Sequence, residues 1–583
     1  MTSAKREPDR PVDITGMAAQ PRRTDPDFEL LIQHASRTLD PSTAVRFRDQ
    51  KLHSTVYGAA QLLVRPTEHE RSVIDRLLEI AEGLGWKAEV NPVDERLVEL
   101  ARRADIGPTD PQPLLRRVRL TPLSDQGLVE LPDAWQVLQR FRAGAADDAE
   151  RDAVQLDHVL ISHSQSIFGT PYWRVPGTTG NPYWRVPGTG NPYLDVPSGV
   201  AEYGIPGFGG RAPVAWVGPE PDRRPDDQLD GQRRPVIALL DTGVGKHLWF
   251  PASVVDHDAT CAELPIGLTD AETAPEDAAV RINPLLGELD EVAGHGTFCA
   301  GLIRQKCPDA TILAIRVIQA DGVVTESDLL ETLNKLWLRQ KLAIKNSRPE
   351  DLIDIVSMSL GYYHEDYEDL QFDPLLLAPI RALAQLGVMI VVSSGNDSTT
   401  RPMFPAAFAP YPGGIIAEPL PDELPVVAVG GSNPDHSVAL FSNEGPWVRA
   451  HRPGAALVST MPPFDAAGSP RIEIDSSGVD RTLRTPRANN ARSTIDPDDF
   501  TSGFGVWSGT SFAAPILAGE LAQYLTVYWL LARDDVDPSH AVDRGWEAIS
   551  NRVPDLRRPG QGADDEAVDH EAEDTDYSAG GSE

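Results

Sequence analysis

At 583 residues the chain is longer than one ordinary hydrophobic core supports, so at least two domains are expected. A hydrophobic fraction of 41% is sufficient for globular folding over most of this length. The formal net charge of −34 excludes the basic surface that nucleic-acid binding requires.

Cysteine usage indicates a reducing compartment. The three cysteines, Cys261, Cys299 and Cys307, are too few for a disulfide framework. The first residues lack the apolar segment of a secretory signal peptide, and no apolar run is long enough to span a bilayer. We therefore expect a cytoplasmic protein that binds neither membranes nor nucleic acids. The negative charge provides solubility or, in a sharper interpretation, attracts basic substrates.

The N-terminal part of the chain divides into two regions. Residues 1–54 are polar and turn-rich, and we expect them to be largely disordered apart from a short helix near Phe28–Ser36. Residues 55–163 show regular apolar periodicity. It predicts strands and helices in the order β-α-β-β-α-β, which is typical of a ferredoxin-like α+β domain. The expected strands are Tyr57–Val64, Trp86–Val90, Leu115–Leu120 and Leu156–Ile161, and the expected helices are Glu68–Leu84 and Ala134–Phe141.

Residues 164–229 form a connector that is dense in glycine and proline. Asn181–Gly188 nearly copies Thr170–Gly177, and Asn191–Pro197 repeats the pattern again. So much proline and glycine cannot form a packed helix. The repeat is either a duplicated spacer or an arm that lies on another surface through its tyrosine and tryptophan side chains.

Residues 230–552 alternate strand-like and helical runs, which predicts a mainly parallel α/β sheet with helices on both faces. In such a sheet, functional residues gather at the carboxyl ends of strands and at helix N-termini. Residues 553–583 are acidic and low in apolar residues, and we expect a disordered tail. The expected strands are Val236–Leu240, Thr311–Val317, Ile353–Met358, Val388–Ser393 and Leu424–Val429, with helices at Glu326–Leu338 and Leu376–Gln385.

Three short motifs in this region contribute an acid, a base and a hydroxyl group. Asp241–Gly243 directly follows the first strand, Gly294–Thr297 comes next, and Ser508–Pro515 completes the set. A serine hydroxyl is a weak nucleophile until a neighbouring base takes its proton, and a carboxylate orients that base. The order Asp, His, Ser differs from the orders in chymotrypsin and in the α/β-hydrolases.

On these motifs, residues 230–552 resemble the subtilases, the subtilisin-like serine peptidases. The resemblance implies that Ser511 is the nucleophile, His295 the general base and then acid, and Asp241 the carboxylate that orients His295. Ser511 opens an apolar helical run, where the helix dipole favours developing negative charge. Pro515 is expected in the first turn of this helix, the place where proline is tolerated.

The resemblance also assigns an oxyanion site and a substrate cleft. Asn396 would donate its side-chain amide to the oxyanion together with the backbone N–H of Ser511. Pairing of a substrate strand on both sides would hold it extended. Tyr362 replaces a glycine common in the family and could reshape the first specificity pocket. The implied substrate-binding residues are Gly322, Ser359, Leu360, Gly361, Ser394 and Gly395.

Two insertions, 256–291 and 464–499, are expected to be surface loops, and Cys299 is expected to be a small buried hydrophobe. No cofactor is implied. Subtilases often bind structural calcium, for which the acidic loops could supply oxygen ligands, although no EF-hand-like spacing occurs.

The resemblance gives the domain at 55–163 the properties of a subtilase propeptide, which docks on the catalytic domain and inhibits it through its C-terminal end. The alternative is a regulatory or recruiting domain that is not cleaved. The sequence therefore predicts an intracellular serine endopeptidase that acts on a protein or peptide substrate and inhibits itself. The rival hypothesis is a catalytically silent subtilase fold that serves as a binding or scaffold protein.

Overall fold

We analysed a computed structural model of the chain. The tandem repeat, the acidic tail, the expected helix near Phe28–Ser36 except its last residue, and most of the second insertion lie outside the described residues. The structure describes residues 36–46, 51–66, 69–92, 94–107, 115–123, 131–162, 203–204, 209–215, 217–277, 279–281, 289–366, 375–464, 472–473, 491–492, 500–529 and 531–560.

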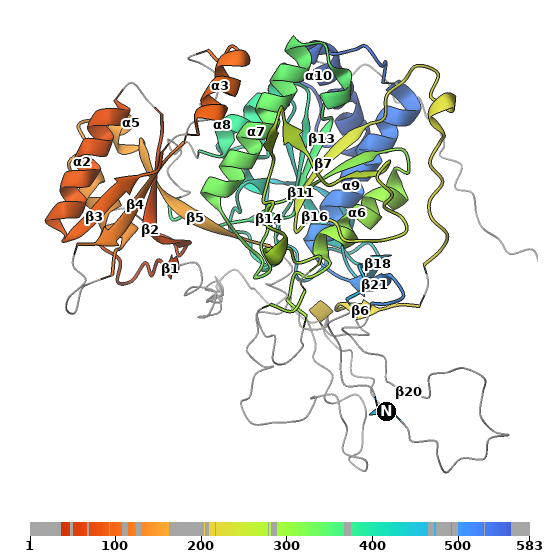
Figure 1. Ribbon diagram of the computed structural model, residues 1–583, viewed down its shortest axis with the longest axis horizontal. Coiled ribbons are helices and arrows are strands. Elements are labelled where there is room, and N and C mark those ends of the chain that lie inside the picture. Colours follow the sequence, from red (N-terminus) through yellow and green to blue (C-terminus); the bar gives the residue numbers. More distant parts are fainter. Residues whose placement is uncertain are drawn as a thin grey trace, which may run out of the picture.

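The N-terminal unit is an antiparallel sheet covered by helices (Figure 1). Its central strands follow the order β5-β2-β4-β3, and β1 pairs with β2. The predicted strands and helices are present, and α3 and α5 are additional. The elements are β1 (Ser36–Thr38), β2 (Val56–Val64), α2 (Glu70–Gly83), β3 (Trp86–Val90), α3 (Glu95–Arg103), β4 (Arg116–Pro122), α4 (Ala134–Ala143), α5 (Asp148–Arg151) and β5 (Val154–Ser162).

The N-terminal unit starts earlier than the predicted boundary at residue 55. Leu39 and Leu52 are buried in the core of this unit, and Trp135 Nε1 donates to Val45 O at 2.9 Å. The prediction that residues 1–54 are largely disordered is therefore wrong for 36–46 and 51–54. The pairing of β1 with β2 depends on partners that follow in the sequence, so local polarity did not reveal it.

The larger unit is built on a sheet whose neighbouring strands are all parallel, in the order β17-β16-β15-β13-β7-β11-β8. Side chains alternate between its faces, so Ile237 and Leu239 of β7 join one core while Ala238 and Leu240 join the other. The strands are β7 (Val236–Asp241), β8 (Val255–Asp256), β11 (Thr311–Arg316), β13 (Ile355–Met358), β15 (Met389–Ser393), β16 (Val426–Ser432) and β17 (Val448–Pro453).

Helices cover both faces of this sheet (Figure 1). Side chains of α6, α9 and α10 fill the core on one face, and those of α7 and α8 fill the core on the other. Leu97 and Leu100 of α3 also enter the second core, so the N-terminal unit packs on the α7 side. The helices are α6 (His295–Lys306), α7 (Glu326–Lys345), α8 (Leu377–Gln385), α9 (Thr510–Tyr524) and α10 (Pro538–Arg552).

The first insertion is not a simple surface loop. Cys261, Leu264 and Ile266 lie in the core on the α7 side, and Glu276 and Asp290 are buried as well. Its apolar residues are spaced singly among acidic ones, which hid this burial in the sequence. The remaining strands are β6 (Ala212–Pro213), β9 (Thr260–Cys261), β10 (Leu264–Pro265), β12 (Val323–Thr325), β14 (Leu360–Gly361), β18 (Leu457–Thr460), β19 (Ile472–Glu473), β20 (Ala491–Arg492) and β21 (Phe504–Trp507).

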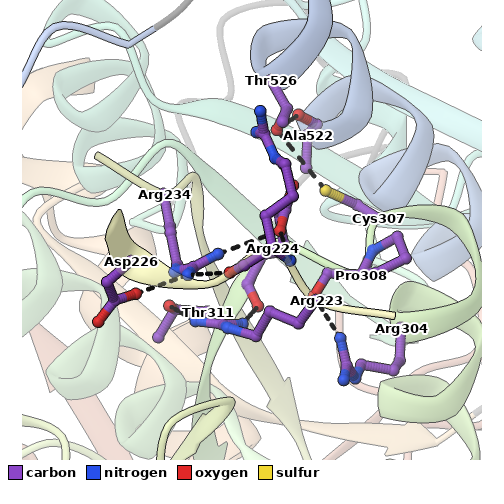
Figure 2. A network of polar contacts seen from close by, with 12 residues as sticks. Arg223, Arg224, Asp226, Arg234, Arg304, Cys307, Pro308, Thr311, Ala522 and Thr526 are labelled. Carbon is purple, nitrogen blue, oxygen red and sulfur yellow. Dashed lines mark hydrogen bonds and ion pairs between the residues drawn. The ribbon is translucent and has the colours of Figure 1, made fainter. Parts of the chain in front are cut away.

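An arginine network fixes the segment that leads into β7 (Figure 2). Arg223 donates to Ala310 O at 2.6 Å, and Arg224 and Arg234 donate to the Asp309 carboxylate at 2.6 and 3.1 Å. These contacts attach the end of the predicted connector to the loop between α6 and β11. β6 also pairs with β21, so the large unit begins near residue 209 rather than at 230.

None of the helices in the described part of the chain is both long enough and apolar enough to cross a membrane.

Candidate active site

Asp241 and His295 meet at the carboxyl edge of the parallel sheet. Asp241 is the last residue of β7, and His295 is the first residue of α6. Asp241 Oδ1 lies 2.7 Å from His295 Nδ1 and also accepts from the backbone N–H of Thr242 at 2.8 Å. Both side chains are buried. Because Nδ1 carries the proton that Asp241 accepts, Nε2 of the neutral ring is left as the basic nitrogen.

Two glycines allow His295 to reach this position. Gly294 precedes α6 with a φ of 81°, a left-handed conformation that favours glycine. At Gly296, a Cβ atom would lie only 1.9 Å from Gly243 O. Only glycine therefore lets the start of α6 contact the turn that follows β7. This contact also allows Gly296 N to donate to Thr242 Oγ1 at 2.8 Å.

Ser511 lies in the first turn of α9, but Pro515 does not lie in the first turn as predicted. Pro515 is inside the helix and has no N–H to donate to the carbonyl of Ser511, four residues earlier. That carbonyl accepts instead from Ser359 Oγ at 2.9 Å and from Cys299 Sγ at 3.6 Å. Because Pro515 cannot donate to the Ser511 carbonyl, two side chains from other elements donate to it and position the Ser511 backbone.

The basic nitrogen of His295 and the hydroxyl of Ser511 are both buried. No hydrogen bond joins His295 Nε2 to Ser511 Oγ, and neither atom has another partner among the described residues. Phe512 and Trp507 pack against the His295 ring, with centroid distances of 5.1 and 5.6 Å. Cys299 Sγ lies 3.9 Å from His295 Nδ1, so the α6 and α9 residues share one small volume.

Asn396 lies beside the start of α9. Its Oδ1 accepts from Thr510 N and from Thr510 Oγ1, both at 2.9 Å. These two bonds determine which amide atom is oxygen and leave Nδ2 as the donor end. A Cβ on Gly509 would lie 3.3 Å from that Nδ2, so the nitrogen is close to the backbone that leads into Ser511.

The end of β5 lies between two strands of the large unit. Leu160 pairs with Val324 of β12, and Ile161 pairs with Gly361 of β14, both antiparallel. Ser162 N donates to Gly322 O at 2.9 Å. Figure 1 shows β5 leaving its own sheet and running toward β14. One strand of the N-terminal unit is therefore held on both sides by the segments predicted to bind a substrate.

Comparison with known proteins identifies the family. The chain matches the Subtilase family, Peptidase_S8, over residues 232–536, which is more than half of its length. This chain belongs to the subtilase family. It is 29% identical to Serine protease AprX of Bacillus subtilis over 52% of this chain and 59% of AprX. It is 26% identical to Subtilase-type proteinase psp3 of Schizosaccharomyces pombe over 43% of this chain and 42% of psp3.

The chain thus spans less than two thirds of either relative. A solved structure of a cold adapted subtilisin-like serine proteinase is also similar, with a TM-score of 0.31 and 19% identity, over 53% of this chain and 80% of that one. Family membership and the parallel sheet with helices on both faces together give this subtilase the subtilisin-like α/β fold.

The other residues predicted to bind a substrate, Ser359, Ser394 and Gly395, are not paired with β5. Ser359 donates its hydroxyl to the Ser511 carbonyl. Ser394 is buried and donates from Oγ to Asn443 O at 3.2 Å, and Gly395 N donates to Thr510 Oγ1 at 3.1 Å. In the structure these two residues support the loop that carries Asn396. Tyr362 is also buried, and its ring stacks on that of His158.

Glu276 is a residue of this site that sequence analysis missed. It lies in the first insertion and is fully buried beside Asp241. Its carboxyl group forms hydrogen bonds with Thr242 Oγ1 at 2.5 Å and with Thr297 Oγ1. It thereby ties together the turns that follow Asp241 and His295. Burial raises the pKa of Glu276 to about 8, so the group is largely protonated at neutral pH.

We expect Glu276→Ala to lower the free energy of unfolding by about 2–4 kcal/mol, because it leaves a cavity and removes a hydrogen-bond partner from two buried hydroxyls. Glu276→Gln retains one donor and one acceptor and should behave like wild type at pH 7. Because the folded pKa near 8 exceeds the unfolded value near 4.5, this contribution is fully present below about pH 4.5 and is lost as the pH rises from there through about 8. Denaturant unfolding at pH 5 and pH 9 should show this loss in wild type and a smaller one in Glu276→Gln.

The described residues contain two groupings of potential metal ligands: the Asp241, His295 and Cys299 side chains, and the His158, His364 and Glu365 side chains. The first belongs to the site that contains Ser511. Burial raises the pKa of Cys261 and of Cys307 to about 11 and that of Cys299 well above its usual value, so all three thiols are protonated and unreactive.

Proposed function

We propose that this subtilase is a serine endopeptidase that hydrolyses peptide bonds through Asp241, His295 and Ser511 and an acyl-enzyme intermediate. The observation that carries the proposal is the buried pair of Asp241 and His295, which orients the imidazole. Cys299 Sγ contacts both His295 and Ser511, at 3.9 Å from His295 Nδ1 and 3.6 Å from Ser511 O. A catalytically silent fold has no need for an oriented imidazole so near a buried serine whose hydroxyl has no partner among the described residues.

In this mechanism, His295 Nε2 takes the proton of Ser511 Oγ as that oxygen attacks the scissile carbonyl carbon. Asp241 stabilises the imidazolium that forms. The carbonyl oxygen becomes an oxyanion that accepts hydrogen bonds from Asn396 Nδ2 and from Ser511 N–H. His295 then gives its proton to the leaving amine, and the acyl-enzyme remains. Water repeats the sequence and releases the acid.

We further propose that the N-terminal unit is a ferredoxin-like, propeptide-like domain that inhibits the enzyme. The support is the end of β5, which takes up main-chain partners on both β12 and β14. A strand bound in this way excludes a substrate strand from the same partners. Arg117 adds ion pairs to Asp328 and Glu331 of α7, at 3.1 and 3.2 Å.

A fluorophosphonate probe tests the peptidase proposal directly, because it reacts with an activated serine. We expect labelling of wild type, no labelling of Ser511→Ala, and unchanged labelling of Ser437→Ala, a serine on an exposed turn. If wild type is not labelled even after removal of the N-terminal unit, the protein is a silent fold that binds or scaffolds other proteins.

Asn396→Ala is expected to lower kcat by about 10²–10³-fold with little change in KM, which is the magnitude known for the oxyanion asparagine of another subtilase. The oxyanion exists mainly in the transition state, so its donor affects turnover more than binding. Because alanine also removes the bonds to Thr510, Asn396→Asp is the matched control: it keeps that acceptor but lacks the N–H donor. A pure KM defect in both variants would contradict the assignment.

A cytoplasmic location and a structural calcium ion remain predictions. The three free, buried cysteines are compatible with a reducing compartment.

A further inference from the structure

A histidine of the N-terminal unit is buried between two carboxylates of the catalytic unit. His158 lies on β5, and its Nδ1 is 2.6 Å from Glu326 Oε2 while its Nε2 is 2.7 Å from Glu365 Oε2. All three side chains are at most 1% exposed. The Tyr362 ring stacks on the imidazole at a centroid distance of 4.6 Å.

The proton positions follow from these contacts. Both ring nitrogens of His158 face carboxylate oxygens, so both carry protons and the ring is an imidazolium. Burial alone would lower the pKa of His158, but Glu365 and Glu326 outweigh it and raise that pKa to about 10. The contacts thus place a cationic ring between two carboxyl groups of the catalytic unit.

The same contacts argue against a metal ion in this cluster. The backbone N–H of Asp366 donates to His364 Nδ1 at 2.9 Å, so Nδ1 is the acceptor and Nε2 carries the proton. Burial lowers the pKa of His364 to about 3, so the ring is neutral. A protonated Nε2 cannot ligate a metal. It points instead to Glu365 Oε2, at 3.5 Å.

The carboxylates of Glu326 and Glu365 lie next to the site at which a substrate strand would bind. Glu326 begins α7 directly after β12, and Glu365 follows β14 by a short turn, so both flank the strand site that β5 occupies. His158 directly precedes Val159, which pairs with Thr325 at the end of β12. A substrate strand in the place of β5 would bring one of its own side chains between the same two carboxylates.

We propose that Glu326 and Glu365 form an acidic subsite that selects substrates with a basic side chain at the position that His158 occupies in β5. This position lies four residues before the substrate residue that replaces Ser162. Both carboxylates belong to the catalytic unit and remain when β5 leaves. A docked strand buries both carboxylates, as β5 does, and two buried carboxylates are costly without a cation, so a lysine, arginine or protonated histidine of the substrate is favoured. The net charge of −34 would also attract such substrates.

A first test does not depend on catalysis. In the full-length chain with Ser511→Ala, His158→Lys retains a cation and His158→Gln retains hydrogen bonding without charge. We expect His158→Lys to melt closer to the parent than His158→Gln. With Glu326→Gln and Glu365→Gln added, this order should disappear or reverse, because the cation then lacks its partners. A glutamine variant at least as stable as the lysine variant, with both glutamates intact, would overturn the proposal.

A second test concerns substrates, and it rests on the proposed peptidase function. Peptides copying residues 154–168, with lysine, glutamine or glutamate at the position of His158, are compared by kcat/KM. We expect lysine to exceed glutamine by about 10- to 100-fold and glutamate to be the poorest. The Glu326→Gln, Glu365→Gln enzyme should reduce the lysine-to-glutamine ratio to about one.

Glu350→Gln is the matched control, since it removes an exposed carboxylate from the same unit and should leave that ratio unchanged. A ratio near one in wild type, with peptides that are cleaved, overturns the substrate preference and leaves the peptidase function intact. Absence of both cleavage and fluorophosphonate labelling counts against the peptidase function instead, and the melting comparison then decides the preference of the subsite for a cation.

Discussion

Ser511→Ala and His295→Ala are each expected to lower kcat by about 10⁶-fold, and the double variant should be no worse than either single one. This magnitude is the one known for subtilisin, a member of the same family. The physical reason for non-additivity is that the base acts only on the proton of this hydroxyl. Once either Ser511 or His295 is missing, the other has no step left to accelerate.

Steady-state kinetics on one peptide substrate measure this effect, and Asp241→Asn extends the comparison. Asparagine keeps a contact with His295 Nδ1, but its amide can donate a hydrogen bond as well as accept one. When the amide donates to Nδ1, the imidazole proton lies on Nε2, and Nε2 can no longer act as the base. We expect a smaller loss for Asp241→Asn, about 10⁴-fold. A double Ser511, His295 variant that is much slower than either single variant would show that the two residues act independently, contrary to the proposed mechanism.

The parts of this site that sequence analysis could predict are those that short motifs carry. Asp241 follows an apolar strand, and His295 and Ser511 each lie in a glycine-containing motif that begins a helix. The structure brings Asp241 and His295 into contact at the carboxyl edge of the sheet, because parallel strands end along one edge. The order of the main strands and helices was also predictable, because each of these elements has its own apolar pattern within a short stretch of sequence.

The parts that sequence analysis missed depend on contacts between distant segments. Glu276 lies in an acidic insertion, and nothing in its neighbourhood distinguishes it from the surface carboxylates around it. The role of Pro515 depends on donors supplied by Ser359 and Cys299, from other elements. His158 lies in the expected strand Leu156–Ile161, but its two carboxylate partners are brought to it only by the docking of β5. In each case a buried polar group is satisfied by residues far away in sequence.

Autoprocessing in the connector is the second large effect that we expect. Wild type should cut itself after His163, in the glycine- and proline-rich segment, and Ser511→Ala should stay full length, because it lacks the nucleophile. The direction of β5 supports this: it runs antiparallel to β14, and its last residue, Ser162, pairs with Leu360, the neighbour of Ser359, whose hydroxyl contacts the Ser511 backbone. Mass spectrometry of the purified proteins identifies the new termini.

The same docking predicts inhibition by the released unit. A fragment covering residues 36–163 should inhibit a chain that starts near residue 209, with an inhibition constant of about 1 μM or below, the range usual for interfaces of standard size. Its His158→Gln form should inhibit more weakly, because Glu326 and Glu365 then face each other without a cation between them. The start near residue 209 matters, since β6 pairs with β21 and belongs to the catalytic unit. If wild type remains intact while fully active, and the fragment does not inhibit, the N-terminal unit is a regulatory or recruiting domain, and the strand pairing of β5 serves to hold it in place.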